Sequence, residues 1–95
     1  MTTQTLVSKY IASADQVLEK IQFVETPLNV NVEDIKKTVT HAKTYLDDAK
    51  YYRGIQKFDV SLTSVAYCEG LLDALRFIGA VKFEWPTKPQ EDREK

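Results

Sequence analysis

The chain has 95 residues, of which 43% are hydrophobic and 28% charged, and its net charge is −1. These values describe one soluble globular domain, and they exclude a strong basic field that would draw it to nucleic acid or acidic membranes. The one cysteine excludes an internal disulfide and fits a reducing compartment. No signal peptide and no apolar stretch long enough to span a bilayer is found, so we expect a cytoplasmic protein.

Apolar periodicity predicts a first helix over residues 3–24. Its apolar residues recur at spacings of three and four, the pattern of one helix face: Leu6, Tyr10, Ala14, Val17, Ile21 and Val24. Proline disfavours helix in the residue before it, so Thr26-Pro27 ends the segment. An amphipathic helix of this kind gains most of its stability by packing.

Two further helices are expected over residues 32–53 and 58–79. Asn31 has the side chain of an N-cap, and Lys57 or Asp59 opens the third helix. Gly54 marks the end of the second helix, and Gly79 is placed as the C-terminal cap of the third. Because their connection is short, these two helices should be antiparallel neighbours.

The fold predicted from these segments is all-α, an antiparallel three-helix bundle over residues 1–80 followed by a tail over residues 81–95. In the tail, Phe83 and Trp85 lie on a short extended segment that can pack on the bundle. Residues 87–95 contain no large apolar side chain, and we expect them to be disordered.

A candidate polar pocket lies on the third helix. Glu69 falls among the positions of that helix that we expect to be buried, where an unpaired carboxylate is costly. Asp73 and Arg76 share its flank, and their spacing of three suits an ion pair. Together with His41 of the second helix, these side chains could line a site for a cation or a basic ligand. The commoner interpretation is a structural network of satisfied side chains.

Two further surfaces are candidates for binding. A partner surface would combine the tyrosine flank of the second helix with the tail aromatics: Tyr45, Tyr52, Phe83 and Trp85. A stripe of lysines with a seven-residue spacing could track phosphates: Lys36, Lys43, Lys50 and Lys57. Such a stripe is more often the solvated border of an apolar face.

The sequence does not indicate an enzyme. No serine-nucleophile motif, phosphate-binding glycine loop or CxxC motif occurs. His41 has no second histidine or cysteine at ligand spacing, so we expect neither a metal nor a cofactor. Cys68 lies within the apolar arc of its helix and has the character of a buried hydrophobe.

Residues 42–52 and 66–75 resemble a family of short archaeal proteins, domain of unknown function family 357. Tyr45-Leu46-Asp47-Asp48-Ala49-Lys50-Tyr51-Tyr52 is similar to its Y-x-x-D-A-x-Y-[YF] pattern, and residues 67–75 are similar to Y-x-x-G-L-L-D-A-L. The chain departs from the family at the turn, where members have glycine-aspartate and a following alanine and this sequence has Gln56-Lys57-Phe58-Asp59 and Ser61. The resemblance implies an all-helical archaeal protein and no particular activity.

These observations favour a non-catalytic interaction or adaptor module, with a homodimer as a natural version of it. Two alternatives remain open at this point. One is a ligand- or nucleotide-associated accessory domain that uses the polar pocket. The other is a weak RNA-binding protein that uses the lysine stripe.

Overall fold

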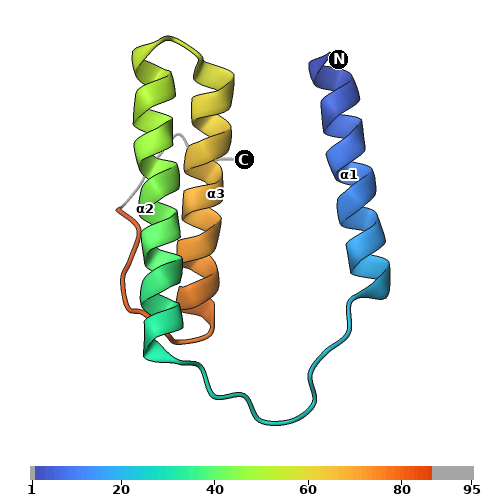
Figure 1. Ribbon diagram of the computed structural model, residues 1–95, viewed down its shortest axis with the longest axis vertical. Helices are drawn as coiled ribbons and strands as arrows, with labels where there is room; N and C mark the ends of the chain where they lie inside the picture. The colour runs from blue at the N-terminus through green and yellow to red at the C-terminus, as the bar shows by residue number, and fades with distance from the viewer. Residues whose placement is uncertain (1, 87–95) are drawn as a thin grey trace.

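The computed structural model describes residues 2–86, which form three helices: α1 (Thr3–Lys20), α2 (Val32–Gly54) and α3 (Phe58–Phe77) (Figure 1). The all-α class is confirmed, and no strand occurs in this range. The expected disorder of residues 87–95 lies outside the described residues. α1 ends at Lys20, four residues before the predicted end, because Ile21 already has an extended backbone with φ −63° and ψ 138°. The apolar spacing continued past the helix and did not mark its end.

The N-cap predicted for α2 is confirmed, whereas the C-terminal end of the helix differs from the prediction. Asn31 Oδ1 accepts a hydrogen bond from the Glu33 backbone N–H at 2.8 Å. At the other end Gly54 is still helical, and Gln56 takes the left-handed position with φ 64°. The N–H groups of Gln56 and Lys57 donate to the carbonyls of Arg53 and Tyr52. This Schellman arrangement usually has glycine at the position that Gln56 occupies.

α3 begins after Lys57, whose side chain makes no capping hydrogen bond. Its end follows the prediction, since Gly79 has φ 80°. The Gly79 N–H donates to the Arg76 carbonyl at 3.0 Å, and the Ala80 N–H donates to the Leu75 carbonyl at 2.9 Å. Gly79 is therefore the left-handed residue that ends the helix.

α2 and α3 pack side by side as the predicted antiparallel pair (Figure 1). The buried side chains between them are few and mostly small: Ala42, Ala49, Cys68 and Leu75. Small side chains let two helix backbones come close together. The close approach also allows Ser61 Oγ to donate a hydrogen bond to the Ala49 carbonyl at 2.7 Å.

α1 stands apart from this hairpin and packs against neither of its helices (Figure 1). The expected packing of the first helix onto the other two is therefore not seen. Its apolar face is open to solvent, with Tyr10 63% and Leu18 68% exposed. The connection to α2, residues 21–31, is also rich in exposed apolar side chains, including Phe23 at 84%.

None of the helices described is both long enough and apolar enough to cross a membrane.

Candidate functional site

Asp73 ties the tail to α3. Its Oδ1 atom accepts hydrogen bonds from Trp85 Nε1 at 2.8 Å and from Arg76 Nη2 at 3.2 Å. The Phe83 ring packs edge-on against Trp85 at a centroid distance of 4.9 Å. The Arg76 guanidinium lies 5.1 Å from the centroid of Phe77 and 5.4 Å from that of Phe83. The tail aromatics thus pack on their own hairpin, as one of the two sequence interpretations expected.

The Asp73 carboxylate is stabilised in its charged form. The Trp85 hydrogen bond is the main cause that lowers the pKa of Asp73 below its usual 3.8, while desolvation opposes the shift. The hydrogen bond and positive charge of Arg76 lower this pKa further. Both hydrogen bonds that Asp73 Oδ1 accepts come from groups of the same chain, so the arrangement is that of a structural network.

Glu69 does not belong to this network. The prediction that its carboxylate is buried is wrong, because Glu69 is exposed in the folded chain. It lies just outside the face of α3 that contacts α2, and its charge contributes to the raised pKa of the neighbouring Cys68 thiol, after burial. Of the predicted polar pocket, only Asp73 and Arg76 are joined by a hydrogen bond or ion pair.

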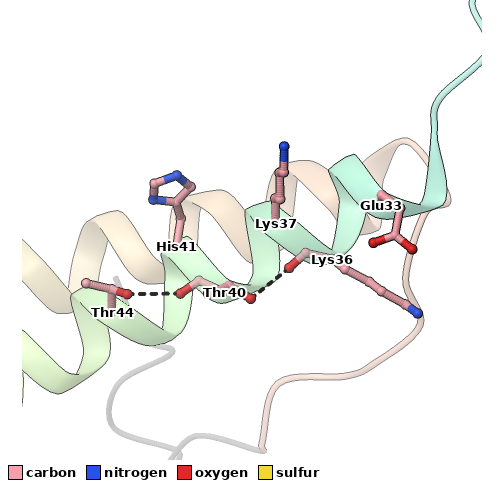
Figure 2. A pocket seen from close by; sticks show the side chains of 6 residues that line it. All are labelled: Glu33, Lys36, Lys37, Thr40, His41 and Thr44. Carbon is pink, nitrogen blue, oxygen red and sulfur yellow. Dashed lines mark hydrogen bonds between the residues drawn. The ribbon is translucent and has the colours of Figure 1, made fainter.

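His41 lies on the exposed surface of α2 and lines a shallow depression made by that helix alone (Figure 2). The residues around it are Glu33, Lys36, Lys37, Thr40 and Thr44. The Thr40 and Thr44 hydroxyls donate to the Lys36 and Thr40 carbonyls, so neither points at the histidine (Figure 2). Within residues 2–86, no group of three or more His, Cys, Asp and Glu side chains could hold a metal ion.

The four lysines of the predicted stripe are all exposed, but they do not form one helical row. Lys36, Lys43 and Lys50 lie on α2, whereas Lys57 is the N-cap residue of α3. Glu33 borders Lys36 in the same depression. An acid at that point opposes the binding of phosphate.

The tyrosine flank of α2 is partly used inside the hairpin. Tyr45 packs edge-on against Tyr67 of α3, with centroids 4.4 Å apart and an interplanar angle of 89°. Tyr52 packs in the same manner against Tyr51 at 5.2 Å. Both flank residues, Tyr45 and Tyr52, are half-buried. Tyr45 therefore contributes to the contact between α2 and α3, whereas the aromatic contact of Tyr52 lies within α2.

A larger apolar groove lies between α1 and α3, at a place that sequence reasoning did not indicate. It has a volume of about 680 Å³. Its walls are Thr3, Leu6, Val7, Tyr10, Ile11 and Ala14 of α1, and Asp59, Val60 and Thr63 of α3. Asp59 is the one charged residue among them. The periodicity of α1 identified one wall, but the groove exists because α1 is separated from α3.

Comparison with protein families matches residues 9–81 to the family described as protein of unknown function, DUF357. The chain belongs to this family. The DUF357 match begins inside α1 and includes α2 and α3, so it extends beyond the two motifs that carry the resemblance. Residues 9–20 of α1 therefore belong to the DUF357 unit together with the hairpin. The comparisons with curated proteins and with solved structures found no match.

Proposed function

We propose that this DUF357 protein is a non-catalytic interaction module that binds another polypeptide through the apolar face of α1 and the groove beside it. The observation that carries the proposal is the exposure of that face. Leu6, Tyr10 and Val17 all lie on it and are all exposed. A contiguous apolar surface of this kind is typical of an association site.

The charge pattern of α1 supports association with a protein. Between Thr3 and Ala14 the only charged residue is Lys9. It lies three residues after Leu6, so helical periodicity places it at the edge of the apolar stripe and not at its centre. Charged residues are depleted at the centres of protein interfaces, and aromatic residues such as Tyr10 are enriched there. The polar pocket has less support as a ligand site, since Asp73 already accepts hydrogen bonds from Arg76 and from Trp85 of the tail.

The proposal is tested by capture of associated protein with a tagged full-length chain in its own cells. Tyr10→Asp places a charge on the stripe, and Gln16→Asp places the same charge on the polar face of α1 as a control. Because an unpaired charge in an apolar interface is costly, we expect Tyr10→Asp to reduce the associated protein by roughly tenfold or more. The control should retain it.

Associated protein includes untagged copies of the same chain, which mass spectrometry distinguishes from other polypeptides. Equal recovery by the wild type, Tyr10→Asp and Gln16→Asp would show that the α1 stripe is not the binding surface, and the proposal would then be wrong.

A further inference from the structure

The occupant of the groove between α1 and α3 follows from the volume of the groove, the surface that the chain leaves exposed, and the complementarity of the α1 stripe to itself. We infer that it is α1 of a second copy, so that two chains exchange their first helices around a two-fold axis. This inference rests on the proposed function and names the partner. The chains would be arranged in the order α3, α1 of the second copy, α1, and α3 of the second copy.

The groove has room for part of a helix. An α-helix about 10 Å in diameter fills about 420 Å³ per turn, and the groove holds about 680 Å³, which is room for a turn and a half. Its two walls belong to α1 and α3, and no residue of α2 lines it. A first helix that completed a bundle within one chain would lie against both α2 and α3. Here α1 faces α3 alone, across a space that a further helix can fill.

The surface left open is large enough for a stable dimer. The chain exposes 8683 Å², whereas a compact protein of 10.9 kDa exposes about 5,600 Å². If residues 87–95 are assigned the full area of an unfolded chain, and the rest of the chain the area of a compact protein of its own mass, the exposed surface is still roughly 1,900 Å² larger than expected. Obligate dimers bury about 2,000–5,000 Å² over both partners, so burial of most of this surplus in each copy reaches that range.

The stripe of α1 is self-complementary in an antiparallel pairing, as a two-fold interface requires. With the axis near Ala12, the large Tyr10 of one copy lies opposite the small Ala14 of the other. At the ends, Leu6 lies level with Val17 and Leu18 of the second copy. The arc from Leu6 to Ile11 is wide enough to contact two neighbours, here α1 and α3 of the other chain.

The first measurement is the solution mass of the purified full-length chain by light scattering. We expect twice the 10.9 kDa chain mass for the wild type and for Gln16→Asp, and the single-chain mass for Tyr10→Asp. The emission of Trp85, which Asp73 holds against α3, should be unchanged in Tyr10→Asp if the hairpin stays folded. A wild type of single-chain mass at all concentrations would overturn the inference.

Cysteine pairing gives a second test that does not depend on a disruptive variant. In a Cys68→Ala background, Ile11→Cys lies close to the two-fold axis and should oxidise to a disulfide-linked dimer. Gln16→Cys, on the polar face, should not. Val7→Cys combined with Val60→Cys joins α1 to α3 of its own chain only if α1 closes on its own hairpin. A rapid disulfide within one chain in that variant, with no linked dimer from Ile11→Cys, would also overturn the inference.

The two proposals fail separately. If Tyr10→Asp abolishes capture of a different polypeptide while the purified chain has the single-chain mass, the interaction module stands and the second copy is the wrong partner. If Tyr10→Asp changes neither the capture nor the mass, both proposals are wrong.

Discussion

At the scale of single residues, the two helix ends of the hairpin use the same backbone geometry with different amino acids. Gly79 has a positive φ at no steric cost, whereas Gln56 adopts φ 64° with a side chain. The left-handed conformation costs an L-residue about 1–2 kcal/mol. Gln56 is thus a site at which the local sequence and the fold disagree.

Gln56→Gly should therefore stabilise the protein. We expect the free energy of unfolding to rise by about 0.5–1 kcal/mol, because glycine removes the left-handed strain but adds freedom to the unfolded chain. Urea denaturation measures this change. Gly79→Ala is the matched control with the opposite sign, since space is open around Gly79 and only its backbone conformation opposes a side chain. A loss of stability in Gln56→Gly would contradict the assignment of strain.

Asp73 gives a pH-dependent contact with a fluorescent reporter. Its pKa is lower in the folded chain than the usual 3.8, so its charged form stabilises the fold at pH values above 3.8. That contribution is lost as the pH falls below 3.8 and through the lower pKa of the folded state. We expect the emission of Trp85, the only tryptophan, to shift to longer wavelength over this acidic range as the tail detaches.

Substitutions separate Asp73 from its neighbour Glu69. Asp73→Ala should give the detached emission of Trp85 already at pH 7, because it removes the acceptor of the 2.8 Å hydrogen bond. Glu69→Gln, at an exposed carboxylate, should leave the emission and its pH dependence unchanged. The same emission in Asp73→Ala as in the wild type would mean that another contact holds the tail.

At the scale of the elements, the hairpin depends on small residues in α2. Ala42 is 2% exposed and Ala49 5%, and the Ser61 hydroxyl reaches across to the Ala49 carbonyl. A larger side chain at either alanine has no cavity to enter. It would move the two helices apart, and the Ser61 hydrogen bond would be lost.

Ala42→Leu should lower the free energy of unfolding by about 1–3 kcal/mol, the usual cost of overpacking. Lys43→Leu adds the same side chain at the exposed neighbouring position, and its effect should lie within about 0.5 kcal/mol of zero. Denaturant titration of both variants, followed by circular dichroism, makes the comparison. Equal effects from the two would show that α2 and α3 are not closely packed at Ala42.

At the scale of the whole molecule, the hairpin alone buries few side chains, and α1 buries none. An isolated helix of this length is marginal in water. The exchange of α1 between two copies would supply the missing core, and stability would then depend on association.

The melting temperature should consequently rise with protein concentration, because a dimer that unfolds to separate chains obeys mass action. We expect an increase of about 5–10 °C over a hundredfold range of concentration, because that range corresponds to about 2.7 kcal/mol and 1 kcal/mol shifts the melting temperature of two such chains by about 2–4 °C. Tyr10→Asp should melt at a lower temperature that does not vary with concentration. A constant melting temperature of the wild type over the same range would contradict an association-dependent fold.

The sequence by itself determined the features that depend on local backbone chemistry. The three helices, the Asn31 cap and the Gly79 end follow from propensity, proline and glycine placement and side-chain hydrogen bonding over a few residues. The two motifs of the hairpin carried the resemblance to the family that residues 9–81 match. The left-handed Gln56 was not foreseen, since glutamine gives no local signal for that conformation.

Only the tertiary structure decided which amphipathic faces meet. The wide apolar arc of α3 allowed Glu69 to be assigned to the buried side, and the orientation of α2 leaves it exposed. The pairing of Asp73 with Trp85 joins residues twelve apart through the path of the tail. The sequence likewise did not indicate that α1 is separated from the hairpin, or that a groove lies between them. An amphipathic pattern states that a helix needs a partner, but the same apolar face is satisfied by any neighbour, because the hydrophobic effect has no direction.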